Sequence, residues 1–135
     1  GIKIPYHSGL KGHSDGDVIV HSIIDSLLGA MRKKDIGTFF PDNQKKYKNI
    51  RSPKMLKPIN NVLSKNNYYI NNLDINLICE QPKVSKYRDK IIKSLSSLLS
   101  IDKELINLKG KTVEKLGLIG KEKAIACEVI CSISE

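Results

Sequence analysis

The chain has 135 residues, the size of one domain with one hydrophobic core. Its formal net charge is +9, yet it contains 20 lysines against 3 arginines, and aromatic residues make up 5%. Because base readout relies on arginine and single-strand binding on stacked aromatic rings, this composition favours a solvated lysine-rich surface over a nucleic-acid binder. No apolar run approaches the ~20 residues of a membrane-spanning helix, so no membrane partner is expected.

The first third of the chain predicts one long helix behind a loop. Residues 1–5 are expected to end a strand, and Tyr6 to Gly16 is a loop punctuated by glycines. From Asp17 the apolar residues repeat at helical spacing, and the helix should end near Lys33 and Lys34. Asp15 or Asp17 is suited to cap this helix because a carboxylate accepts hydrogen bonds from its first amides.

The remaining chain alternates between helical and strand patterns. Irregular backbone is predicted for residues 35–42, a mobile loop for 43–49, helices for 51–65 and 84–99, and strands for 73–79, 106–109 and 124–133. Pro53 suits the first turn of its helix, whereas Pro58 is expected to kink it. The alternation predicts a single domain over residues 1–135, of α/β or α+β class, with helices packed on a sheet.

The three cysteines are expected to be reduced. Cys79, Cys127 and Cys131 cannot all pair within the chain, and two of them lie in apolar strand-like runs. Cysteines in apolar strands are more often reduced core thiols than members of a disulfide framework or a metal cluster.

The stretch from His13 to His21 contains two histidines, two carboxylates, a serine and a glycine just before the long helix. A neutral imidazole is a good zinc ligand, and a catalytic zinc ion commonly has three protein ligands and one open position. Only His21 is well placed, with His13 as a possible neighbour, so the residues alone do not supply a full zinc set. The alternative for His21 is a core histidine with satisfied hydrogen bonds.

Two further segments carry polar groups suited to phosphates or sugars. Asp35-Ile36-Gly37 and Pro41-Asp42 form an acidic loop that suits ribose hydroxyls or magnesium; the alternative is a solvated loop with a helix C-cap at Gly37. The segment from Lys109 to Gly117 combines lysines, a hydroxyl and a carboxylate after a strand, a set that suits phosphates and a divalent cation. Its glycine spacing excludes a P-loop, and the alternative is an ordinary charged turn.

Taken in order, these segments resemble the 2-C-methyl-D-erythritol 2,4-cyclodiphosphate synthase family over essentially the whole chain. The matching pieces are Ile4-Pro5-Tyr6, His13-Ser14-Asp15-Gly16-Asp17-Val18 with His21, Asp35-Ile36-Gly37, Phe40-Pro41-Asp42, Gln81-Pro82-Lys83, Thr112-Val113-Glu114-Lys115-Leu116-Gly117 and Ile125-Ala126-Cys127-Glu128.

The resemblance implies an α/β subunit with a four-stranded mixed sheet covered by helices, assembled as a homotrimer with active sites between subunits. It implies a lyase of non-mevalonate isoprenoid biosynthesis that cyclises 4-diphosphocytidyl-2-C-methyl-D-erythritol 2-phosphate and releases CMP. The implied cofactors are Zn²⁺ and either Mg²⁺ or Mn²⁺. The implied partner is a small CDP-type substrate.

The resemblance also implies roles for individual residues. His21 would bind zinc, and Glu114 would hold the second ion and contact the substrate. His13 and Thr112 would stabilise the charge that develops during the reaction. The remaining substrate contacts would come from Ser14, Asp35, Gly37, Phe40, Asp42, Lys83 and Lys111.

The chain also departs from the family pattern. Family members begin with a strand whose Asp-x-His pair supplies two zinc ligands, so we expect roughly 20–30 further residues upstream of Gly1 in the native protein. Without that strand, zinc binding and activity should be lost. Lys111 and Val113 replace hydroxyl residues, and Lys121 and Lys123 would place positive charge near the trimer axis, where an anion could bind.

Two other functions compete with the enzyme. One is a catalytically silent trimeric scaffold of the same fold. The other is a basic nucleic-acid-binding domain, whose affinity for DNA or RNA should fall steeply as the salt concentration rises. The abundance of Lys, Asn and Ile is typical of AT-rich genomes. The resemblance implies a pathway that resides in a plastid in eukaryotes, so together with this composition the expected location is a relict plastid in a eukaryote or the cytoplasm in a bacterium.

Overall fold

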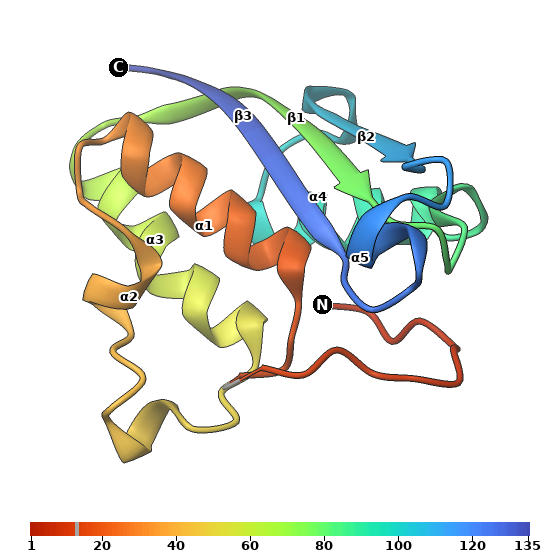
Figure 1. Cartoon of the computed structure of the whole chain (residues 1–135). Helices are drawn as coiled ribbons and strands as arrows, with labels where there is room; N and C mark the ends of the chain where they lie inside the picture. The colour runs from red at the N-terminus through yellow and green to blue at the C-terminus, as the bar shows by residue number, and fades with distance from the viewer. Residues whose placement is uncertain (13) are drawn as a thin grey trace.

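The computed structural model describes residues 1–12 and 14–135 and has helices packed against a small sheet (Figure 1). The α/β prediction is confirmed. The strands are β1 (Tyr69–Ile78), β2 (Ile106–Lys111) and β3 (Ala126–Ser134). The helices are α1 (Val18–Ala30), α2 (Ile36–Phe39), α3 (Ser52–Lys65), α4 (Arg88–Leu99) and α5 (Gly117–Gly120), with 3-10 turns η1 (Lys45–Tyr47), η2 (Val84–Lys86) and η3 (Lys103–Leu105).

The sheet is mixed, with strand order β2-β1-β3. β1 runs parallel to β2, with Leu73 opposite Ile106, and antiparallel to β3, with Asn76 opposite Glu128. A bulge between Ile70 and Asn72 interrupts the second pairing. Residues 1–12 and 14–135 form a sheet of three strands, whereas a sheet of four strands was expected.

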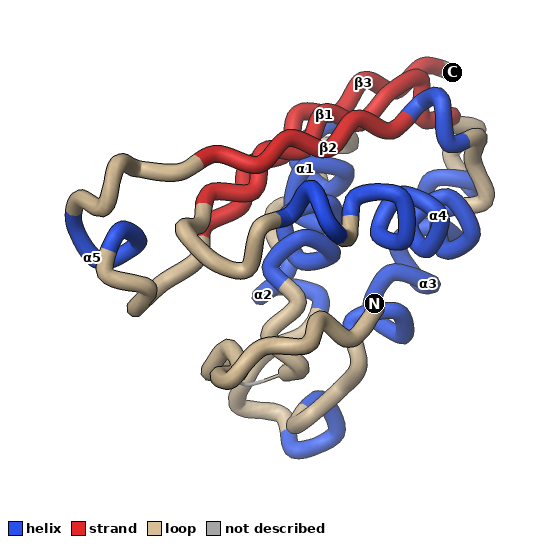
Figure 2. Tube along the Cα trace, turned by 90° about the vertical axis from the view of Figure 1, so that its right-hand side faces the viewer, coloured by secondary structure: helices blue, strands red, loops and turns tan. Residues whose placement is uncertain are grey.

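The helices cover one face of the sheet and leave the other open (Figure 2). Inward side chains of β1, such as Leu73 and Ile75, are fully buried in the core to which α1 contributes Ile23 and Leu27. The open face, opposite the helices, is largely polar: Lys109 Nζ lies 2.6 Å from Asp74 Oδ2. None of the described helices is long and apolar enough to cross a membrane.

Several predicted boundaries need correction. Residues 1–5 have no strand structure, because they pair with no neighbouring strand in the described chain. α2 lies where irregular backbone was expected; Asp35 caps it, so Gly37 is a helical residue and not a C-cap. A 3-10 turn, η1, forms within the predicted loop 43–49.

The cysteine prediction is confirmed, because all three thiols are free. Cys79 is buried, and Cys127 and Cys131 are half-buried on β3. Burial raises the pKa of the Cys127 thiol to about 11, so this thiol stays protonated at neutral pH.

Candidate active site

The N-terminus of α1 brings Ser14 and His21 together. Asp17 caps the helix, with its Oδ1 accepting a hydrogen bond from the Val20 N–H at 3.0 Å, and this fixes the first turn. His21 follows in that turn, half-buried, and its Nε2 lies 3.2 Å from Ser14 Oγ. The structure therefore pairs two of the predicted residues. His13 lies outside the described residues.

Asp15 does not cap α1 but joins the loop to α3. Its Oδ2 accepts hydrogen bonds from the Ser52 N–H at 2.8 Å and from Ser52 Oγ at 2.9 Å, and the Ser52 side chain is fully buried. Partial burial raises the Asp15 pKa, but the hydrogen bonds from Ser52 outweigh it and the net shift is downward. The second carboxylate oxygen lies 3.9 Å from His21 Nε2.

Sequence reasoning missed Ser52. The only local signal is the Ser52-Pro53 pair at the start of a helical pattern, which is typical of a helix N-terminus but says nothing about a distant carboxylate. Ser52 lies 37 residues from Asp15 in the chain, so the contact depends on the fold.

The acidic loop is organised around α2. Asp35 Oδ1 accepts hydrogen bonds from the Thr38 N–H at 2.7 Å and from Thr38 Oγ1 at 2.9 Å, and both lower the Asp35 pKa. Phe40 follows α2 and packs edge-on against Tyr47 at 5.4 Å between ring centroids. Gly37 lies within α2 and Asp42 shortly after it, and both are exposed. Asp35, Gly37, Phe40 and Asp42 therefore form one local unit around α2.

A second unit lies beyond the ends of β1 and β2. Thr112 and Glu114 are exposed after β2, with Thr112 Oγ1 3.4 Å from Glu114 Oε1. Lys111 ends β2, and its carbonyl accepts a hydrogen bond from the Cys79 N–H at 2.9 Å. Lys83 follows the cis Gln81-Pro82 bond on the segment after β1 and is also exposed.

Glu80 connects these two segments and was not predicted as a functional side chain. Its Oε1 accepts hydrogen bonds from the Val113 N–H at 3.0 Å and the Lys115 N–H at 3.1 Å. These bonds hold the Glu80 pKa below its ordinary value. The sequence signal, a carboxylate directly after a strand, is weak.

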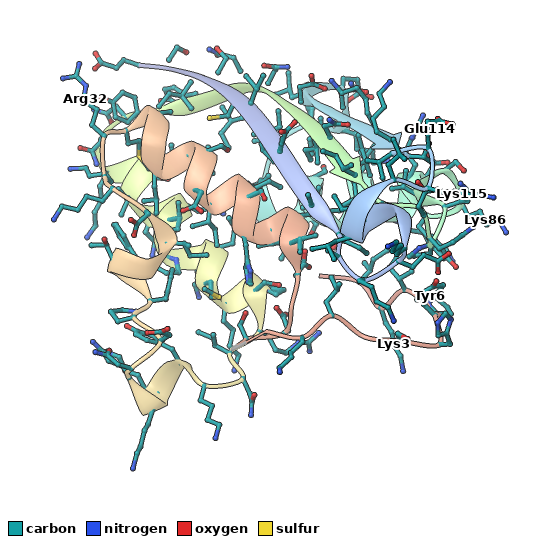
Figure 3. The ribbon with its side chains drawn as sticks, in the orientation of Figure 1. Lys3, Tyr6, Arg32, Lys86, Glu114 and Lys115 are labelled. Atoms are coloured by element: carbon teal, nitrogen blue, oxygen red, sulfur yellow. The ribbon has the colours of Figure 1, made fainter. Side chains whose placement is uncertain are left out.

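The two units do not meet within one chain. Figures 1 and 2 both separate α2 from α5, which directly follows the Thr112–Glu114 segment. Figure 3 places Glu114 and Lys115 beyond the ends of β1 and β2, at the side opposite Arg32, which follows α1. Within one chain, α2 and the segment before α5 therefore lie on different sides of the described structure.

The described residues do not form a complete zinc site, because they contain no group of three or more His, Cys, Asp or Glu side chains able to hold a metal ion. Among the described residues, the Asp15 carboxylate lies near His21, and Ser52 already occupies its other oxygen. Glu114 suits a different ion. An exposed carboxylate next to a phosphate site is a common magnesium ligand, because Mg²⁺ takes few protein ligands and completes its shell with phosphate oxygens and water.

Comparisons with known proteins follow the same motifs. The model of the YgbB family matches residues 1–134. A 2-C-methyl-D-erythritol 2,4-cyclodiphosphate synthase from Wigglesworthia glossinidia brevipalpis is 50% identical over 135 residues, covering 100% of this chain and 85% of that enzyme. A bifunctional enzyme IspD/IspF from Pelagibacter ubique is 52% identical over 133 residues, and the chain spans 98% of its own length but 36% of that enzyme.

The fold is similar to that of a solved structure described as an IspF from Plasmodium falciparum in complex with CDP. The two chains are 47% identical with a TM-score of 0.80, over 91% of this chain and 73% of the other. That structure shows that a relative with this fold binds a cytidine nucleotide.

Proposed function

Because this chain belongs to the YgbB family, we propose that it is a 2-C-methyl-D-erythritol 2,4-cyclodiphosphate synthase acting in isoprenoid biosynthesis. The observation that carries the proposal is 50% identity, over 85% of its length, to a relative named for this activity. The substrate would be 4-diphosphocytidyl-2-C-methyl-D-erythritol 2-phosphate, and the products the cyclic diphosphate and CMP.

The proposed reaction is an intramolecular phosphoryl transfer. An oxygen of the 2-phosphate forms a bond to the β-phosphorus, the bond from that phosphorus to the bridging oxygen breaks, and CMP leaves. Because the nucleophile is tethered to the electrophile, the protein mainly has to orient the two groups and neutralise their charge. This requirement agrees with the exposed Lys111 at the end of β2 and the exposed Thr112 and Glu114 just after it.

Each unit of the candidate site has a role in this proposal. Asp35 and Gly37 would bind the ribose hydroxyls, with Phe40 and Asp42 in the same substrate-binding segment. Lys83 and the backbone around it would receive the cytidine. Lys111 would hydrogen-bond the phosphates, His13 and Thr112 would stabilise the charge that develops on them, and Ser14 would contact the substrate. A magnesium or manganese ion held by Glu114 would draw negative charge from the α- and β-phosphates.

We further propose that the working enzyme is a homotrimer with its sites between subunits. The separation of the Asp35 unit from the Glu114 unit supports this arrangement, because one substrate has to contact both. The open face supports it as well: Ile130 on that face is 73% exposed in a single chain, and packing against other copies would cover it. His21 would contribute one zinc ligand.

The test is CMP release from the substrate by the native protein, measured with saturating Mg²⁺. Glu114→Gln and Thr112→Val should each lower kcat by about 10²-fold or more, because each removes a group that stabilises transition-state charge. Glu104→Gln, on the exposed turn η3, is the matched control and should leave kcat unchanged. A folded, metal-replete protein that releases no CMP would support the silent scaffold, whereas steeply salt-dependent retention on RNA would support the nucleic-acid binder.

A further inference from the structure

The Glu80 side chain lies between the two segments that the proposed function assigns to cytidine and to the phosphates. We propose that Glu80 is a positioning residue: it holds residues 112–115 in the conformation that presents Thr112 and Glu114 to the diphosphate. The inference rests on the proposed function, which gives Thr112 and Glu114 their contacts with the phosphates. Glu80 itself would touch neither the phosphates nor the metal ion.

The contact is made by a single oxygen atom. Glu80 Oε1 accepts the N–H of Val113 and the N–H of Lys115, the residues on either side of Glu114. Fixing both neighbouring amides leaves the Glu114 backbone little freedom. The direction of the Glu114 side chain therefore depends on a carboxylate from the segment after β1.

The backbone that Glu80 holds is strained. Glu114 and Lys115 have φ angles of 52° and 62°, two consecutive left-handed residues that are not glycine. Such a conformation persists only where the surroundings enforce it, and this is typical of binding and catalytic segments. The two hydrogen bonds to Glu80 provide that enforcement at the residues that need it.

The other side of the same segment is fixed by close packing. A Cβ on Gly120 would lie 2.0 Å from the carbonyl carbon of Lys115, so the backbone of α5 contacts Lys115 directly. The Leu116 N–H also donates to the Val113 carbonyl at 2.9 Å. Residues 113–116 are thus held between α5 and the Glu80 carboxylate.

Glu80 is itself well anchored. The Cys79 N–H donates to the Lys111 carbonyl at 2.9 Å, which continues the pairing of β1 with β2 up to the residue before Glu80. Just beyond, Val84 packs against Gly110 of β2. The segments after β1 and β2 are therefore joined on both sides of Glu80, so we expect a change at Glu80 to alter the positions of Thr112 and Glu114.

The test compares Glu80→Ala, Glu80→Gln and Glu80→Asp, with Glu104→Ala as the matched control. The Gln side-chain oxygen can still accept both amides, so Glu80→Gln should stay within about threefold of the wild-type kcat. Glu80→Ala should lower kcat at least about tenfold and raise the Mg²⁺ concentration for half-maximal activity, because Glu114 loses its orientation. Glu80→Asp keeps the charge but is shorter, so it should resemble Glu80→Ala.

The second measurement is hydrogen exchange of the Val113 and Lys115 amides, which should accelerate in Glu80→Ala and Glu80→Asp but not in Glu80→Gln. The inference is overturned if a folded Glu80→Ala keeps the wild-type kcat and Mg²⁺ dependence, or if Glu80→Gln loses as much activity as Glu80→Ala. If Glu80→Ala does not fold, Glu80→Asp decides by the same criteria. A wild-type protein that releases no CMP would overturn the proposed function, while the exchange data would still report on the hydrogen bonds.

Discussion

Gly110 lies on β2 at a point where no side chain fits. A Cβ there would lie 2.1 Å from Cγ1 of Val84, a β-branched side chain that is 8% exposed and has little room to move. We predict that Gly110→Ala lowers the free energy of unfolding by about 1–3 kcal/mol, the usual effect of overpacking. It should also lower kcat, because β2 and the segment after β1 are pushed apart next to Thr112. Chemical denaturation and the CMP-release assay measure the two effects.

The matched control for Gly110→Ala is the double variant with Val84→Ala, which removes the clashing methyl group. Each single variant should be destabilised, Val84→Ala through the cavity it leaves. The double variant should be less destabilised than the sum of the two, because the added and removed methyl groups occupy the same space. Additive effects would show that Gly110 is required for some reason other than contact with Val84.

Glu80 also makes a prediction about pH. Hydrogen bonds from the Lys115 and Val113 amides hold its pKa below the ordinary value for a glutamate. A lowered folded-state pKa means that the ionised carboxylate stabilises the fold above the unfolded-state pKa, and that this contribution disappears as the pH falls through the folded-state pKa. The difference in Tm between wild type and Glu80→Gln should therefore be largest near neutral pH and vanish in acid. If the difference in Tm stays constant from neutral to acid pH, the ionised Glu80 carboxylate does not stabilise the fold through these hydrogen bonds.

At the residue scale, the sequence revealed what is local and missed what the fold brings together. Ser14 and His21 lie seven residues apart, and a cap at the start of a helix is enough to pair them. The partners of Asp15 and Glu80 are 37 and 33 residues away, so their contacts depend on where α3 and β2 pack. The strained φ angles of Glu114 and Lys115 have no sequence signature either, because neither residue is a glycine.

Among the elements, α3 contains a proline that local chemistry does not favour. Pro58 lies in the middle of the helix, has no N–H to donate to the Lys54 carbonyl, and yet the helix continues to Lys65. We predict that Pro58→Ala raises the free energy of unfolding by about 1–2 kcal/mol. Alanine is much more favourable than proline inside a helix, but part of this gain is lost because alanine gives the unfolded chain more conformational freedom. Pro53→Ala, in the first turn where proline is tolerated, is the matched control and should not be stabilising. A lower Tm for Pro58→Ala would mean that the ring's own packing outweighs the lost hydrogen bond.

Elements with a clear apolar period were predictable, and those defined by pairing or capping were not. The spacing of Ile91, Leu95 and Leu99 is enough to predict α4, because all three are buried on one side. β1 begins at Tyr69, four residues before its alternating pattern, because Tyr69, Ile70 and Asn72 pair with β3 although two of these three are exposed. α2 consists of four residues held by the Asp35 cap, which is too short for a periodic signal.

For the whole molecule, the sequence predicted an α/β domain but not which motifs would be neighbours. Alternating helical and strand patterns favour helices on a sheet, and the structure agrees. The separation of Asp35 from Glu114 follows from the path of the chain: after α1 the chain turns back, and the Ile36 N–H of α2 donates to Asp25 Oδ1 of α1 at 2.7 Å, whereas Glu114 follows β2 on the other side of the molecule (Figures 1 and 3). The pattern of residues within either segment does not indicate that Asp35 and Glu114 are far apart in the fold. Only the family resemblance suggested that the site is shared between subunits.

Sites between subunits can be tested by mixing two inactive proteins. Asp35→Ala removes the proposed ribose contact and Glu114→Ala the proposed ligand of the second metal ion, so each variant alone should have little activity. If a site takes Asp35 from one subunit and Glu114 from its neighbour, random co-assembly in equal amounts should leave about one site in four with both residues intact, and the mixture should recover about a quarter of wild-type activity. Mixing preformed oligomers without exchange is the control and should recover none. If both residues act from the same chain, no mixture regains activity, and the proposed arrangement fails even though the enzyme is active.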